Sequence, residues 1–105
     1  MRKLTIKRDK TFVGCAMKAK VYLKDESGDV LIQGSKCRFV TTIKNNSSET
    51  FDIDENENII YVIYDTLSKD YCFGKKVIPA GKDDVVIHGK PKFSPFKGNP
   101  FVFMD

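Results

Sequence analysis

The sequence is poor in the residues on which catalysis and metal binding most often depend. It contains no tryptophan, three cysteines and one histidine, His88. A single histidine excludes the two-histidine metal motifs, and Cys15, Cys37 and Cys72 are too widely spaced to form a Cys-x-x-Cys pair. We therefore expect neither a metal site nor a cofactor.

The cysteines also bear on the compartment. Their number is odd and their spacing wide, which does not suggest a disulfide framework. We expect reduced, mostly buried thiols in a cytoplasmic protein, with one disulfide and one free thiol as the alternative. No continuous apolar stretch follows the basic start of the chain, as a secretory signal would require, although a trimmed leader would leave no trace. The longest apolar run, 59–64, is far shorter than a transmembrane segment.

Phosphate loops and recognisable catalytic triads are absent as well. No glycine is followed by the Lys-Ser/Thr pair of a phosphate loop, so we do not expect nucleotide hydrolysis. Cys72 and His88, with Asp83 or Asp84, are the one trio that resembles a nucleophile with its base, and no motif supports it. A cryptic cysteine enzyme is thus a minor alternative, and we expect no enzyme. We interpret His88 as a partly exposed residue that ends a strand beside Gly89.

Carboxylates gather in one segment, at Asp52, Asp54, Glu55 and Glu57. Such a cluster could hold a hard cation, but the spacing and the turn glycine of an EF-hand are missing. We therefore interpret this segment as a solvated turn rather than as a calcium site.

Alternation of apolar and polar residues is the strongest positive signal. Residues 17–24 place Met, Ala, Val and Leu on one face and Lys or Tyr on the other, which is typical of a half-buried strand. Further strands are predicted at 3–7, 39–43, 51–53, 59–64, 71–78, 85–87 and 101–103. The sequence therefore predicts a single all-β domain over 1–105. We expect a small antiparallel, Ig-like β-sandwich of roughly seven to eight strands, with a small β-barrel as the alternative.

Three features add detail to this fold. Residues 59–64 are apolar or aromatic on both faces, so we place that strand in the interior of a sheet. Gly74 lies in the middle of the strand predicted at 71–78 and indicates a bulge or a close approach. All four prolines fall in the last quarter, and we expect residues 90–100 to form a long irregular loop. Turns are predicted at 24–29, 45–48, 54–58 and 78–81.

The net charge of +4 is unevenly distributed along the chain. Residues 1–24 carry eight basic side chains and one acidic (net +7), residues 25–58 three and eight (net −5), and residues 59–105 seven and five (net +2). Such segregation could form a basic face for an anionic partner. We favour the other interpretation, in which basic strands lie beside acidic ones and cross-strand pairs neutralise both.

Two segments are candidate contact surfaces. One is the Lys/Tyr face of the strand at 18–24, and the other is a loop in which lysines alternate with phenylalanines. The candidate binding residues are Lys18, Lys20, Tyr22, Lys92, Phe93, Phe96 and Lys97. We expect a non-catalytic binding or accessory module for a protein or another macromolecule. The alternatives are binding of nucleic acid or another polyanion through 90–101 and the Lys-rich strands, and a homodimer formed through an edge strand.

Parts of the sequence resemble a known family. Val21-Tyr22-Leu23-Lys24-Asp25 and the later run from Phe51 to Ile59 resemble PEGA-type domains, small β-sandwiches in which a Pro-Glu-Gly turn leads into a hydrophobic strand. The resemblance places Asp54-Glu55-Asn56 at that turn, where Asp replaces the proline and Asn the glycine. It implies a non-catalytic sandwich used for surface or carbohydrate-associated interactions, often outside the cytoplasm.

Overall fold

A computed structural model of the chain describes residues 1–10, 18–64, 74–91 and 101–104. Within these ranges it contains nine strands in two sheets. The strands are β1 (Arg2–Arg8), β2 (Ala19–Lys24), β3 (Val30–Ile32), β4 (Ser35–Ile43), β5 (Ser47–Ile53), β6 (Asn58–Tyr64), β7 (Gly74–Ile78), β8 (Val85–Pro91) and β9 (Phe101–Phe103). The predicted all-β sandwich is confirmed, and these strands form two separate sheets rather than the alternative closed barrel.

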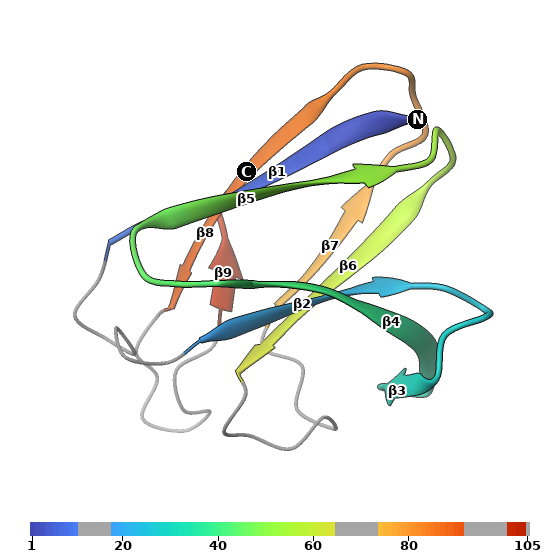
Figure 1. Ribbon diagram of the computed structural model, residues 1–105, viewed down its shortest axis with the longest axis horizontal. Helices are drawn as coiled ribbons and strands as arrows, with labels where there is room; N and C mark the ends of the chain where they lie inside the picture. The colour runs from blue at the N-terminus through green and yellow to red at the C-terminus, as the bar shows by residue number, and fades with distance from the viewer. Residues whose placement is uncertain (11–17, 65–73, 92–100, 105) are drawn as a thin grey trace.

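The two sheets pack face to face (Figure 1). One has four strands in the order β5-β1-β8-β9, and the other has five in the order β3-β4-β2-β6-β7. Neighbouring strands are antiparallel except β1 and β8, which pair in parallel with Leu4 opposite Val85. The expectation of an antiparallel sandwich therefore has one exception. Alternation shows which face of a strand is buried, but it carries no information about strand direction.

The core lies between the sheets. It is built from inward-facing aliphatic side chains of both layers, namely Leu4, Ile6, Ala19, Val21, Leu23, Ile43, Ile53, Ile60, Val62, Ile78 and Ile87. Each buried leucine or isoleucine of this kind stabilises the fold by about 1.5–3 kcal/mol. These residues are the apolar members of the alternating segments, which is why the sequence pattern located the strands.

Strand β6 lies between β2 and β7, as its sequence predicts. Its two faces serve different clusters. Ile60 and Val62 belong to the core between the sheets, whereas Tyr61 and Ile63 pack with side chains of β2, β3 and β4 on the other side of the five-stranded sheet. Both faces of the strand are therefore buried.

The shortest hairpin was not predicted. Strand β3 joins β4 through Gln33 and Gly34, whose φ angles are 50° and 81°, and Ile32 pairs with Ser35. Two positive φ angles in a two-residue loop define a type I′ turn, which suits the twist of the flanking strands. Gln is an unusual residue at the first position, where Asn is preferred, so the turn signal in the sequence is weak.

Two strand ends differ from their predictions. Strand β7 begins at Gly74, so this glycine does not lie in the middle of a described strand, and residues 71–73 fall outside the described part of the chain. Strand β8 continues through Pro91, which pairs with Phe101. The first residues of the predicted 90–100 loop are thus strand. Proline is tolerated there because it is the last residue of β8 and no further ladder bond is needed.

Ion pairs between neighbouring strands neutralise part of the charge that is segregated along the chain. Basic β1 lies beside β5, and Lys3 forms an ion pair of 2.7 Å with Asp52. Arg38 pairs with Asp25 at 3.1 Å. The cross-strand interpretation of the charge pattern is confirmed at Lys3 and Asp52.

Two edge strands carry a charged residue that faces the core side. Glu49 on β5 stands opposite buried Ile6, and Lys76 on β7 stands opposite buried Ile60. A charge that points inward at a sheet edge opposes pairing with another chain, because pairing would bury it. The alternative of a homodimer through an edge strand stays a prediction.

Candidate functional site

The predicted Lys/Tyr face of β2 is not an exposed face. Lys18 is exposed and Lys20 half-buried, but Tyr22 is only 4 % exposed, which corrects the expectation of a wet tyrosine. The cause is the second apolar cluster, which covers this side of the sheet and includes Tyr22. Tyr22 packs edge-on against Phe39 with 5.6 Å between ring centroids, and burial raises its pKa.

The other four predicted binding residues, Lys92, Phe93, Phe96 and Lys97, lie outside the described residues. So do Cys15 and Cys72, and with Cys72 the nucleophile of the hypothetical trio. Cys37 is a buried free thiol, as expected.

His88 lies in the middle of β8 rather than at its end, which corrects its predicted place. Its side chain is 40 % exposed, and its Nδ1 is 3.7 Å from Oδ1 of Asp9. Asp84 instead accepts a hydrogen bond of 2.8 Å from the backbone N–H of Lys3. The carboxylate next to His88 is therefore one that the sequence did not indicate.

The acidic segment forms a turn with internal hydrogen bonds. Oδ1 of Asp54 accepts from the Asn56 N–H at 3.0 Å and from Nδ2 of Asn58 at 3.1 Å. Asp52 is held by Lys3, which lowers the pKa of the Asp52 carboxyl through a hydrogen bond and through its charge. Across the described ranges, no group of three or more His, Cys, Asp or Glu side chains is placed to hold a metal ion.

Strand β1 begins and ends with a buried arginine. The first, Arg2, closes the end of the sandwich at which β1 begins. Arg2 is 4 % exposed. Its guanidinium donates to the carbonyls of Asp54, Asn56 and Pro79, at 3.0, 3.1 and 2.8 Å. Gly81 donates its N–H to Glu55 O at 3.0 Å across the same two loops. Arg2 thus ties the β5–β6 turn to the β7–β8 connection.

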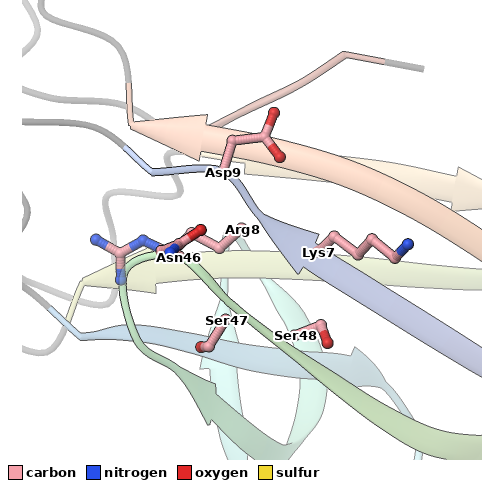
Figure 2. A pocket seen from close by; sticks show the side chains of 6 residues that line it. All are labelled: Lys7, Arg8, Asp9, Asn46, Ser47 and Ser48. Carbon is pink, nitrogen blue, oxygen red and sulfur yellow. The ribbon is translucent and has the colours of Figure 1, made fainter.

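The second arginine, Arg8, is 1 % exposed and joins the two sheets at the opposite end. Its Nη1 donates a hydrogen bond of 2.8 Å to the carbonyl of Ile43, the last residue of β4. A cavity of about 220 Å³ adjoins it, between the end of β1 and the β4–β5 turn. The lining residues are Lys7, Arg8, Asp9, Asn46, Ser47 and Ser48 (Figure 2). We call this the Arg8 cavity.

The β4–β5 turn supplies half of the cavity wall. Asn46 adopts a left-handed conformation with φ of 57°, which asparagine tolerates better than most residues. The Ser47 hydroxyl donates to the Lys44 carbonyl at 2.7 Å and so holds the turn closed. Ser48 is exposed and stands opposite Lys7 in the β1–β5 ladder. The turn and the start of β5 therefore place the Asn46 amide and the Ser48 hydroxyl beside the end of β1.

The cavity continues onto the outer face of the four-stranded sheet. Three rows of side chains cross this face from β5 to β8, because residues opposite each other in a ladder point to the same side. From one end to the other the rows are Asp52–Lys3, Thr50–Thr5–Val86 and Ser48–Lys7–His88. Lysine is paired with aspartate in the first row, whereas the last row holds a lysine beside an imidazole. The positive charge of the face is therefore concentrated next to the Arg8 cavity.

Sequence reasoning missed most of this site. Residues 45–48 were predicted only as a turn, and Arg8 was counted only as a basic residue. A signal was present, because Arg2 and Arg8 fall in the same alternation as Leu4 and Ile6 and must point to the same side of the strand.

Comparisons with protein-family models, with curated proteins and with solved structures found no match for this chain. The PEGA-type resemblance therefore stays a prediction. In the described part of the chain, no helix has the length and apolarity needed to cross a membrane.

Proposed function

We propose that this chain is a non-catalytic binding module that contacts an anionic macromolecule through one half of the outer face of its four-stranded sheet. We call this half the Lys7 face and define it by Lys7, Ser48, His88 and Lys90. The observation that carries the proposal is the difference between the lysines on this sheet. Lys3 is neutralised by Asp52 at 2.7 Å, whereas neither Lys7 nor Lys90 forms an ion pair with another described residue.

Geometry supports a contact surface here. Lys7 and Lys90 are exposed, His88 is half-buried, and all three belong to the adjacent strands β1 and β8. Lys10 follows β1 and is also exposed. Cations fixed on neighbouring strands create a local positive potential that attracts a polyanion and releases its counterions on binding.

The other broad face is a weaker candidate. Its large apolar side chains are buried in the second apolar cluster, where Tyr22, Tyr61 and Ile63 are only 4 %, 3 % and 2 % exposed. Phe39 is the half-exposed aromatic on that side, at 50 %. Lys75 lies over the Tyr61 ring at 5.9 Å and is thereby engaged within the chain. The tyrosines of this face are therefore not available to contact a partner.

The proposal is tested by binding to two anionic polymers, a fluorescent heparin oligosaccharide and a thymidine oligonucleotide, over a series of salt concentrations. We expect the association constant for at least one of them to fall steeply with salt. Each phosphate contact contributes roughly 0.7–0.9 to the slope of log K against log salt concentration. Lys7→Gln and Lys90→Gln should each weaken binding and reduce that slope.

Lys3→Gln is the matched control, because Lys3 lies on the same strand and face but is paired with Asp52. It should change binding little. Absence of binding to both polymers at low salt, or binding that does not depend on salt, would overturn the proposal.

A further inference from the structure

We infer that the Arg8 cavity receives a single oxyanion group, a phosphate, sulfate or carboxylate, carried by the anionic macromolecule. The inference rests on the proposed function, because Lys7 and Ser48 belong both to the Lys7 face and to the cavity. It adds a specific pocket to what would otherwise be attraction between a charged surface and a polymer.

The size of the cavity limits the ligand to a small group. Its volume of about 220 Å³ is below the range of roughly 300–1,000 Å³ that is typical of pockets for drug-sized ligands. All six side chains that line it are polar or charged. A small pocket whose lining residues all carry a polar or charged group suits one compact, strongly hydrated group.

Hydrogen-bond donors dominate the lining. The Lys7 ammonium has three N–H donors, the Asn46 amide has two, and the Ser48 hydroxyl can donate one hydrogen bond. An oxyanion is an acceptor only and therefore complements such a set. The Ser47 hydroxyl already donates to Lys44 O, so it contributes to the shape of the turn rather than to the donor count.

Arg8 contributes positive potential from the wall of the cavity, where Figure 2 shows its guanidinium beside Asn46. Its side chain is 1 % exposed, and its guanidinium is held in place by the Ile43 carbonyl. A buried charge is screened less by solvent than an exposed one, so its field acts more strongly on a nearby anion. The site thus combines an exposed lysine with a fixed arginine charge.

Asp9 is the one anionic side chain in the lining. Figure 2 shows its carboxylate pointing away from Ser47 and Ser48, and its Oδ1 lies 3.7 Å from His88 Nδ1. With Lys7 and Arg8 the formal charge of the lining is +1. The serine side of the cavity, between Lys7 and the β4–β5 turn, is therefore where the oxyanion would sit.

The test is a titration of the isotope-labelled chain with inorganic phosphate at constant ionic strength, followed by backbone amide resonances in NMR spectra. We expect saturable shifts confined to residues 7–9 and 46–48. Lys7→Gln should weaken the apparent affinity by about five- to tenfold, as expected for one charge-assisted contact. Ser48→Asp should abolish saturation by placing a carboxylate in the site.

Lys3→Gln, on the same strand, should leave the phosphate affinity unchanged. Amide dispersion in each spectrum shows that the variant is folded. Sulfate and acetate titrations then rank the oxyanions, and displacement of phosphate by the heparin oligosaccharide shows whether a polymer-borne group occupies the same place as the free ion.

The outcomes separate this inference from the proposed function. Saturable phosphate shifts at the cavity without any polymer binding would support the pocket and overturn the macromolecular function. Polymer binding that leaves residues 46–48 unshifted would support the function and overturn the pocket. Linear shifts spread over all exposed lysines would show a general ionic effect and would also overturn it.

Discussion

Both ends of β1 carry a buried arginine, but the two arginines have different hydrogen-bond partners and different surroundings. Arg2 donates to three backbone carbonyls from two different connections, and the loops around it are linked further by hydrogen bonds of Asn58 and Gly81. Arg8 reaches across to the other sheet through Ile43 O and adjoins a cavity lined by polar side chains. One arginine closes its end of the sandwich, whereas the other adjoins the cavity that we propose binds an oxyanion.

The cavities at the two ends differ in charge as well. Near the Arg2 end a hollow of about 230 Å³ is lined by Lys24, Glu26, Glu57 and Ile59, where carboxylates outnumber the ammonium. The Arg8 cavity has the reverse balance. The comparison teaches that a buried arginine by itself does not mark a binding site. What matters is which charges surround the space beside it.

Arg2→Ala should be the most damaging change at the closed end. It removes the donor from three carbonyls, so we expect a loss on the order of 3–5 kcal/mol in the free energy of unfolding. Urea denaturation followed by circular dichroism measures this. Lys82→Ala, an exposed change in the same region, should stay within about 0.5 kcal/mol of the parent. A loss below about 1 kcal/mol for Arg2→Ala would mean that this end is not closed by the arginine.

Asn58→Ala should have the next largest effect. Its side chain is 7 % exposed, and Nδ2 donates to Asn56 O at 2.8 Å and to Asp54 Oδ1 at 3.1 Å. Losing these bonds at a buried position should cost about 2 kcal/mol, measured in the same urea experiment. Asn56→Ala is the control because the Asn56 side chain is exposed and its structural bond comes from the backbone. Equal losses for the two variants would contradict this account.

Ser47→Ala tests the open end and should be milder. Only one hydrogen bond, from Oγ to Lys44 O at 2.7 Å, is lost from the β4–β5 turn, so we expect about 1 kcal/mol or less. Ser48→Ala should not change the unfolding midpoint but should weaken phosphate binding. If Ser48→Ala destabilised the fold as much as Ser47→Ala, the assignment of one serine to the turn and the other to the ligand would fail.

The smallest effect concerns pH and the Lys3–Asp52 pair. Lys3 lowers the pKa of Asp52 from its ordinary 3.8, and Asp52 raises the pKa of Lys3 from 10.5. The pair therefore stabilises the fold between these values. Its contribution is lost as pH falls through the folded pKa of Asp52 or rises through that of Lys3. Both side chains are exposed, so the effect should be slight.

Asp52→Asn provides the measurement. The parent should lose slightly more stability than this variant when urea midpoints at about pH 7 and about pH 3 are compared, because only the parent protonates a stabilising carboxylate. Identical pH dependence in the two proteins would show that the pair contributes nothing.

Much of the fold could be predicted because the strands obey period two. Met17 to Lys24 and Lys3 to Lys7 alternate, and β6 lacks alternation because both of its faces are covered. Strand β3 was not predicted because three residues are too few to show alternation and its Gln-Gly turn is an unusual hairpin signal. The parallel pairing of β1 with β8 depends on contacts between distant segments, which no local pattern encodes.

The candidate site was less predictable. Tyr22 alternates like an exposed residue, yet a second apolar cluster on that face of the sheet buries it. Arg8 becomes notable only when the β4–β5 turn is brought beside it, some 38 residues later in the chain at Asn46. Lys92, Phe93, Phe96 and Lys97 remain a prediction. Sites assembled from several strands require the fold before the residues can be grouped.

The placement of β1 between β5 and β8 has a consequence for how the chain reaches this structure. Strand β1 can pair with β5 only after Phe51 has been synthesised, and with β8 only after Val85, because these residues stand opposite Leu4 in the two ladders. Loops of that length close slowly, so the search for these partners should dominate the folding time. During synthesis one edge of β1 stays unpaired until Val85, 81 residues after Leu4, has emerged, and the lysines of β1 would oppose association with other chains meanwhile.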